Sequence, residues 1–285
     1  MMRTLEGARL DQWLVAHGYA ATRDEAQAAI MAGDVTVDGV VMDKPGRRTR
    51  AGAQVAVRRP EHSFVGRGGL KLAHALATFG INPSGLTAVD LGASTGGFTD
   101  CLLQAGAARV CAVDVGRGQL AWRLRTDPRV VCLEGMNARY LAAGTVGGPC
   151  DLVTADLSFI SLRLVWRAIA AVVRPRGDVV ALIKPQFEAG RPHVGRRGVV
   201  RDPAVHEAVL RSTLSAAAAC GLAARAVTAS PVTGPAGNIE YLVHLRPATA
   251  AAPATLDLAA VVAEAHARFP TRVPSRPARH PRRRP

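Results

Sequence analysis

Apolar and polar positions form a regular pattern over most of the chain and predict two kinds of element. Short, β-rich apolar runs occur at residues 86–91, 109–115, 130–133, 151–155, 178–183, 224–229 and 239–245. Helical patterns lie between most of these runs, and such alternation is typical of a parallel, doubly wound α/β sheet. The last two runs are joined by a segment rich in proline and glycine. The final strand is therefore predicted to be an antiparallel hairpin partner at the sheet edge.

The first 60 residues follow a different pattern and predict a small separate module. Leu10, Trp13, Leu14 and His17 have the spacing of one helical face, and a second helical pattern ends at Gly33. Asp-Gly at 38–39 stands between two valine-rich runs, which is the pattern of a β-hairpin whose two turn residues need positive φ.

These patterns divide the chain into four segments. We expect an α+β module over residues 1–60, a linker over 61–65, an α/β domain over 66–269 and a Pro/Arg-rich tail without stable structure over 270–285. The helical pattern at 255–269 predicts one more amphipathic helix in the large domain.

Composition favours a cytoplasmic protein that meets polyanions. Hydrophobic residues make up 48% of the 285, which excludes global disorder, and no apolar run is long enough to span a membrane. The N-terminus lacks the pattern of a secretion signal, and the five cysteines include no CxxC pair, as expected in a reducing compartment. Lys+Arg total 36 against 22 Asp+Glu, and the net charge of +14 favours RNA or DNA as a partner.

Lysine is rare in this chain and is therefore informative. Only Lys44, Lys71 and Lys184 are lysines among the 36 cationic residues. A lysine side chain can release its proton, whereas arginine effectively cannot. We therefore treat the lysines as candidates for chemistry.

The N-terminal module resembles the RNA-binding fold named after ribosomal small-subunit protein four, also called the alpha-L motif. The residues that carry the resemblance are Arg9-Leu10-Asp11, Leu14, Gly18, Arg23, Ala26, Ile30, Gly33, Val35, Val37 and Gly39. The resemblance implies that basic residues of the module contact folded RNA. Our candidates for RNA contacts, in the module and in the larger domain, are Arg3, Arg9, Arg23, Lys44, Arg47, Arg67, Arg196 and Arg197.

A glycine-rich turn follows the first strand of the large domain. Its spacing, Gly92-x-x-x-Gly96-Gly97, is neither GxGxxG nor GxxxxGK[ST], which argues against a dinucleotide and against a P-loop. Asp114 ends the second strand, where a carboxylate suits the two ribose hydroxyls of an adenosine. A nucleoside cofactor without a diphosphate fits this arrangement, and S-adenosyl-L-methionine is the leading candidate. The predicted cofactor contacts are Asp90, Gly92, Ala93, Ser94, Thr95, Gly96, Gly97, Phe98, Asp114, Met136 and Asn137.

Over nearly all of residues 3–268 the chain resembles the TlyA family of ribosomal RNA 2'-O-methyltransferases, which is related to the FtsJ/RrmJ group. Besides the N-terminal module, the runs that carry the resemblance are residues 65–72 (VGRGGLKL), 90–100 (DLGASTGGFTD), 156–161 (DLSFIS) and 182–188 (LIKPQFE). The resemblance implies a Rossmann-like, S-adenosylmethionine-dependent methyltransferase domain and a K-D-K-E tetrad at Lys71, Asp156, Lys184 and Glu240. It also implies ribosomal RNA in ribosomal subunits as the partner, with cytidines as targets. We expect a monomer that has no membrane partner.

Methyl transfer to a ribose hydroxyl needs alignment, help with loss of a proton, and stabilisation of the developing charge. Asp156 and Lys184 follow predicted strands and so belong at the ligand-binding edge of an open α/β sheet. We predict that Lys184 takes up or stabilises the proton of the 2'-hydroxyl, with Lys71 favouring release of that proton by repulsion. Asp156 and Glu240 would orient the two lysines.

Two other functions remain open at the level of sequence. A pseudouridine synthase often carries the same N-terminal module, although it needs no adenosyl cofactor. A membrane-active, haemolysin-like protein is a further alternative, because members of the family have been labelled haemolysins. No Cys/His cluster has the spacing of metal ligands, so we predict no metal.

Overall fold

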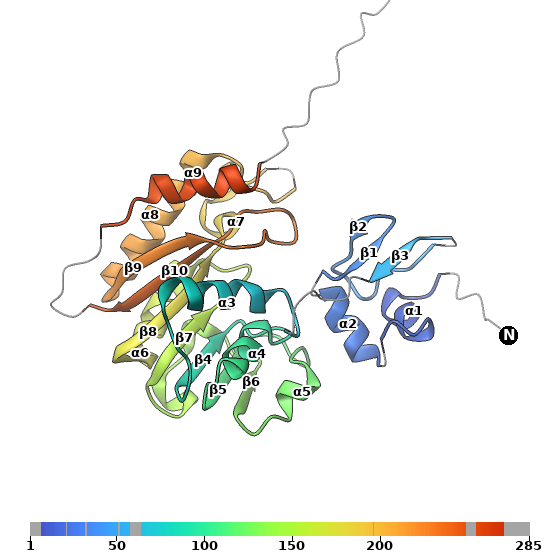
Figure 1. Cartoon of the computed structure of the whole chain (residues 1–285), viewed down its shortest axis with the longest axis horizontal. Coiled ribbons are helices and arrows are strands. Elements are labelled where there is room, and N and C mark those ends of the chain that lie inside the picture. Colours follow the sequence, from blue (N-terminus) through green and yellow to red (C-terminus); the bar gives the residue numbers. More distant parts are fainter. Residues whose placement is uncertain are drawn as a thin grey trace, which may run out of the picture.

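The computed structural model describes residues 7–20, 22–31, 33–50, 52–57, 64–195, 197–248 and 255–270. These residues form a small N-terminal module and a larger α/β domain beside it (Figure 1). Most of the expected linker and all but the first residue of the expected tail lie outside the described residues. None of the described helices is both long enough and apolar enough to cross a membrane.

The N-terminal module packs two helices against a three-stranded sheet. Its elements are α1 (Leu10–Ala16), α2 (Arg23–Met31), β1 (Val35–Val37), β2 (Val40–Val41) and β3 (Val55–Val57), and the sheet order is β2-β1-β3. The turn between β1 and β2 has positive φ at both Asp38 (51°) and Gly39 (75°), as the Asp-Gly pattern predicts. The strand β3, which the sequence pattern missed, pairs antiparallel with β1.

A seven-stranded sheet forms the centre of the large domain. Its strands are β4 (Thr87–Leu91), β5 (Arg109–Asp114), β6 (Val130–Glu134), β7 (Cys150–Ala155), β8 (Val173–Ile183), β9 (Leu222–Ala229) and β10 (Tyr241–Pro247). The order is β6-β5-β4-β7-β8-β10-β9, in which β4 to β8 are parallel and β10 is antiparallel to both of its neighbours.

The expected position of the last strand was wrong in one respect. β10 is the antiparallel partner of β9, but it lies between β8 and β9, so β9 is the edge strand. Tyr241 and Leu242 pack into cores on opposite faces of the sheet, which requires an interior strand. β9 is mostly only half-buried, as an edge strand can be.

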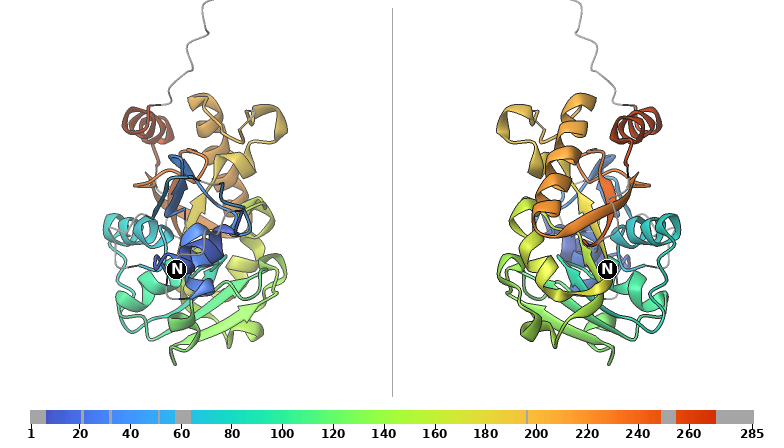
Figure 2. Two further views of the ribbon diagram at one scale, coloured as in Figure 1. Left: turned by 90° about the vertical axis from the view of Figure 1, so that its right-hand side faces the viewer. Right: turned by 90° about the vertical axis from the view of Figure 1, so that its left-hand side faces the viewer.

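Helices cover both faces of this sheet (Figure 2). One face packs against α3 (Gly68–Phe79), α4 (Gly97–Gln104) and α5 (Trp122–Arg125). The other packs against α6 (Trp166–Val172) and α8 (Pro203–Ala219), and α9 (Leu258–Arg268) packs on α8 and β9. The remaining short helices are α7 (Pro185–Glu188), η1 (Ala138–Tyr140), η2 (Ala143–Val146), η3 (Leu162–Leu164) and η4 (Arg191–His193).

The topology brings one set of strand ends together. β5 and β6 lie on one side of β4, and β7 and β8 lie on the other, so the strand order reverses beside β4. Ligands of open α/β sheets bind at the carboxyl ends of the strands at such a reversal. Because β10 runs antiparallel and pairs Tyr241 with Ile183, its first residue belongs to the same edge as the end of β8.

Candidate active site

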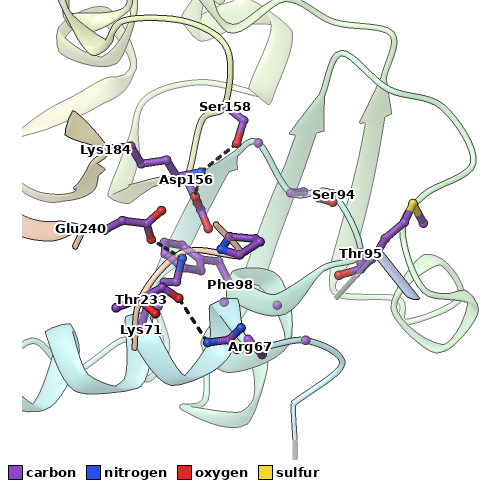
Figure 3. A pocket seen from close by; sticks show the side chains of 17 residues that line it. Arg67, Lys71, Ser94, Thr95, Phe98, Asp156, Ser158, Lys184, Thr233 and Glu240 are labelled. Carbon is purple, nitrogen blue, oxygen red and sulfur yellow. Dashed lines mark hydrogen bonds and ion pairs between the residues drawn. The ribbon is translucent and has the colours of Figure 1, made fainter. Parts of the chain in front are cut away.

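Two adjoining hollows open at this edge of the sheet. The first, which we call the lysine hollow, has a volume of about 200 Å³ and is lined by Lys71, Asp156, Lys184 and Glu240 together with the start of α3 (Figure 3). The second, the ribose hollow, has a volume of about 760 Å³ and contains Asp114, Met136 and Asn137. Gly92, Ser94, Asp156 and Ser158 line both hollows.

Lys71 and Glu240 form a buried ion pair. Lys71 projects from α3, and its Nζ donates a hydrogen bond of 2.5 Å to Oε2 of Glu240. Both residues are less than 10% exposed. A Cβ at Gly234 would lie only 2.5 Å from Oε1 of Glu240. The loop between β9 and β10 therefore needs a glycine at this position to close over that carboxylate.

Lys184 has two partners of different kinds. Its Nζ lies 2.6 Å from Oδ1 of Asp156 and donates a hydrogen bond of 2.8 Å to the hydroxyl of Ser158. Asp156 and Ser158 follow β7, whereas Lys184 follows the neighbouring strand β8. The parallel pairing of β7 with β8 is what brings these side chains together.

The electrostatics of the lysine hollow are balanced between two ammonium groups and two carboxylates. Burial alone would lower the pKa of Lys71, but the charges of Glu240 and Asp156 overcome this and raise it. Burial alone would raise the pKa of Asp156, but Lys184 and Lys71 together lower it. The two ion pairs balance each other's charge, and the guanidinium of Arg67 adds one positive charge to the lining of this hollow.

The glycine turn after β4 is shaped by close backbone contacts. Gly92 has a φ of 82°, and a Cβ there would lie 2.5 Å from the carbonyl oxygen of Asp156. A Cβ at Gly97 would meet the backbone of Gly68 and Gly69 at 3.0–3.3 Å, so the first turns of α3 and α4 approach each other without side chains between them. This contact brings the helix of Lys71 next to the turn.

The second strand end supplies a carboxylate beside the turn. Asp114 accepts hydrogen bonds from the backbone N–H of Ser94 (2.8 Å) and of Gly116 (2.6 Å). The side chain of Asn137 caps η1 by accepting a bond from the N–H of Arg139, and Met136 is hydrogen-bonded through its N–H to the carbonyl of Asp114. A fixed carboxylate at the rim of a hollow of this size suits a ribose, as in other nucleoside sites.

Most of the predicted cofactor contacts line one of the two hollows. These are Gly92, Ala93, Ser94, Thr95, Gly97, Phe98, Asp114, Met136 and Asn137. Asp90 and Gly96 do not. Asp90 is fully buried beneath the turn, where the hydroxyls of Thr99 (2.7 Å) and Thr154 (2.9 Å) donate to its carboxylate. A Cβ at Gly96 would clash with a leucine of α5 at 2.2 Å, so this glycine serves packing.

The predicted RNA-contacting residues are spread over both parts of the molecule. In the N-terminal module, Asp11 is fully buried and accepts hydrogen bonds from Arg9 and Arg23, whose side chains are 41% and 50% exposed. Exposed side chains also include Lys44, Arg47 and Arg197. Arg67 lines the lysine hollow and donates a hydrogen bond to the carbonyl of Thr233. The positions predicted at Arg3 and Arg196 lie outside the described residues.

Sequence reasoning did not single out several residues that line these hollows. Ser158 and Thr233 line the lysine hollow, as does Met31 from the end of α2, and Gln119 lines the ribose hollow. Ser158 lies inside the run 156–161 that carries the family resemblance, which was the available signal. Nothing in the linear pattern places Met31 beside residues of the other domain. No group of three or more potential metal ligands occurs among the described residues.

The fold and the site define the class of protein. A Rossmann-like sheet with an antiparallel last strand pair and a glycine turn after β4 is typical of α/β domains that bind nucleotides or nucleosides. Residues 64–247 match the family of FtsJ-like methyltransferases, and residues 8–55 match the S4 domain. This chain belongs to the FtsJ-like methyltransferase family and carries an S4 domain at its N-terminus.

Individual proteins are similar to the chain over most of its length. The 16S/23S rRNA (cytidine-2'-O)-methyltransferase TlyA of Mycobacterium tuberculosis is 46% identical over 85% of this chain and 91% of its own length. Hemolysin A of Brachyspira hyodysenteriae is 39% identical over 83% of this chain and 98% of its own. The solved structure of a provisionally named hemolysin from Streptococcus thermophilus superposes with a TM-score of 0.72 at 40% identity and covers 93% of this chain and 98% of its own.

Proposed function

We propose that this enzyme transfers a methyl group from S-adenosylmethionine to ribose 2'-hydroxyls of ribosomal RNA. The observation that carries the proposal is the adjacency of the two hollows. The Lys71–Glu240 and Lys184–Asp156 pairs line one, and the ribose-type carboxylate Asp114 lines the other. The relative from Mycobacterium tuberculosis is named for cytidine 2'-O-methylation of 16S and 23S rRNA, which supports cytidines in both ribosomal RNAs as targets.

The residues of the ribose hollow fit S-adenosylmethionine. The positive φ values of Gly92 (82°) and Ser94 (48°) open the turn, and a Cβ at Gly92 would fill the space next to Asp156. Asp114 would hold the ribose hydroxyls, and Met136 with Asn137 would flank the base. When bound, S-adenosylmethionine supplies a methyl group that its sulfonium activates for displacement.

The lysine hollow would receive the ribose of the RNA that accepts the methyl group, whereas the ribose hollow would hold the ribose of S-adenosylmethionine. A 2'-hydroxyl is a weak acid, so its oxygen needs a partner that holds or takes its proton. In this proposal that partner is the neutral amine of Lys184, which forms when its ammonium group releases one proton to solvent, and Asp156 fixes the position of Nζ at 2.6 Å. Lys71, held by Glu240, adds positive charge that stabilises the developing alkoxide. The exposed arginines of the S4 domain would hold the phosphates of the RNA.

Replacing Lys184 tests this proposal. We expect both Lys184→Ala and Lys184→Arg to reduce methyl transfer to ribosomal subunits by about 10²–10⁴-fold, because arginine cannot release its proton. Transfer of labelled methyl groups to 30S and 50S subunits that lack 2'-O-methylation gives the rate, and mass spectrometry of nuclease digests gives the site. Affinity for S-adenosylmethionine, measured by calorimetry, should stay within about threefold, because Asp114 and the glycine turn are intact.

Arg176→Ala is a suitable control, because this exposed arginine lies at the opposite end of β8. Near-wild-type transfer by either Lys184 variant would refute the role of this lysine. Absence of 2'-O-methylated nucleotides in RNA treated with the wild-type enzyme would refute the proposed reaction itself.

A further inference from the structure

Ser158 stands at the point where the two hollows meet. It follows β7 by three residues, is exposed, and lines both the lysine hollow and the ribose hollow. Figure 3 shows its side chain directed at the end of Lys184, and the distance from Nζ to Oγ is 2.8 Å. The lysine to which we assign the proton of the acceptor therefore has a hydroxyl as its second partner.

A lysine ammonium needs more than one partner to have a fixed direction. It has three N–H donors on a flexible four-carbon stem, so a single ion pair leaves the nitrogen free to move around its carboxylate. Contacts at 2.6 Å to Asp156 and 2.8 Å to Ser158 hold Nζ between two points instead of one. Reaction rates depend steeply on such placement, since an error of about 1 Å can cost about 100-fold.

The second partner is uncharged, and this has a chemical consequence. Two carboxylates already face the two ammonium groups of this hollow. A third carboxylate would favour the charged form of the amine and oppose any transfer of its proton, whereas a hydroxyl orients the nitrogen without adding charge. Serine is therefore better suited than aspartate or glutamate to this position.

The hydroxyl of Ser158 has no structural task elsewhere in the described part of the chain. It accepts a hydrogen bond from Lys184, and among the described residues no group accepts a hydrogen bond from the hydroxyl of Ser158. By contrast, the hydroxyl of Ser161 in the same loop is used to hold Glu188. The next residue, Phe159, has a φ of 63°, which is unfavourable for a side chain of this size. Backbone strain of this kind often occurs at functional sites, and here it lies directly after Ser158.

We propose that Ser158 is a positioning residue of the methyl-transfer reaction, and that its hydroxyl holds Nζ of Lys184 at the junction of the two hollows. This inference rests on the proposed function, because it gives Ser158 a task only if Lys184 handles the proton of the acceptor. Ser158 acts through Lys184 and contributes little to the binding of S-adenosylmethionine or of RNA.

Three substitutions at one position test the inference. Ser158→Ala removes the hydroxyl, Ser158→Cys replaces it with a poor acceptor of nearly the same size, and Ser158→Thr keeps it. We expect kcat with 30S subunits to fall by about 10- to 100-fold for Ala and Cys and to return to within about threefold of wild type for Thr. KM for the subunits, calorimetric affinity for S-adenosylmethionine and the melting temperature should change little in all three.

Ser212→Ala serves as the matched control, because Ser212 is an exposed serine on α8 whose hydroxyl donates a hydrogen bond to the carbonyl of Val209 in the same helix. Since Cys is nearly isosteric with Ser, that variant keeps the test decisive if Ala disturbs the fold. The inference is overturned if Ala and Cys keep kcat within twofold, if Thr is no better than Ala, or if the loss appears in cofactor affinity instead of kcat. If Lys184→Ala also retains activity, the role of Lys184 fails together with that of Ser158, whereas a loss of activity in Lys184→Ala alone rejects only the role of Ser158. The proposed reaction itself fails only if wild-type enzyme leaves no 2'-O-methylated nucleotides.

Discussion

At the scale of single residues, Asp90 and Asp156 show how neighbours set the state of a carboxyl group. Both lie at strand ends beside the glycine turn. Asp156 faces two ammonium groups, which lower its pKa despite burial. Asp90 is fully buried and has uncharged partners, the hydroxyls of Thr99 and Thr154 and the backbone of Thr99, so burial raises its pKa to about 7. Asp90 therefore belongs to the support of the turn and not to its charged lining.

This difference predicts a pH-dependent effect of Asp90→Asn on stability. The pKa of Asp90 in the folded protein lies above the unfolded value of about 3.9. Between these two pKa values Asp90 is ionised in the unfolded chain and neutral in the folded one, so the wild-type protein loses stability as pH rises toward 7. The asparagine variant has no such loss. Relative to wild type, its free energy of unfolding should rise by about 1–3 kcal/mol between pH 5 and pH 8, because one pKa unit corresponds to about 1.4 kcal/mol. Urea unfolding across this range measures it, and a pH-independent difference between the two proteins would contradict it.

At the scale of elements, Asp11 joins the two helices of the S4 domain. It lies in the first turn of α1 and accepts hydrogen bonds from Arg23 (3.0 Å) and Gln27 (2.9 Å) of α2, as well as from Arg9. Burial alone would raise the pKa of Asp11, but the hydrogen bonds of these three side chains lower it. One buried carboxylate thus aligns two helices and orients two exposed guanidinium groups.

We expect Asp11→Asn to destabilise the S4 domain by about 1–3 kcal/mol, because buried donors lose a charged acceptor. Faster hydrogen exchange of the α1 and α2 amides, with unchanged exchange in α3 and α4, is the expected result. Asp38→Asn is the matched control, since asparagine also tolerates the positive φ at this turn position. Exchange in α1 and α2 that remains at the wild-type rate in the Asp11 variant would count against this role.

The sequence predicted most elements of the large domain because their signals are local. Buried parallel strands appear as continuous apolar runs, and the glycine turn has a recognisable spacing. The three-residue strand β3 was missed because so short an apolar run does not differ from a loop. The position of β10 was wrong because a hairpin connection specifies pairing with β9 but not what lies on the other side of β10.

At the scale of the whole molecule, the end of α2 in the S4 domain lines the lysine hollow of the other domain. Met31 is 36% exposed and lies there with Arg67 and Thr233. We expect Met31→Glu to raise KM for ribosomal subunits by about tenfold, because a carboxylate at this mouth repels RNA phosphates. Affinity for S-adenosylmethionine should not change.

Met31→Leu, which keeps size and polarity, is the control for this prediction and should behave as wild type. Steady-state kinetics at two salt concentrations measure both variants. The effect of the glutamate should shrink at higher salt, because screening weakens repulsion between charges. An increase in KM for Met31→Leu as large as that for Met31→Glu would show that packing, and not charge, is responsible.

By itself, the sequence determined the kinds of element, the glycine turn and the division into a small N-terminal module and an α/β domain, and it marked Lys71 and Lys184 as candidates for chemistry. These features depend on periodicity, backbone conformation and side-chain type, which are local properties of a chain. Only the tertiary structure decided that Lys71 pairs with Glu240 over a sequence separation of 169 residues, that Ser158 contacts Lys184, and that Asp90 lies beneath the turn. Such contacts depend on strand order and helix packing, which bring together residues that no local pattern relates.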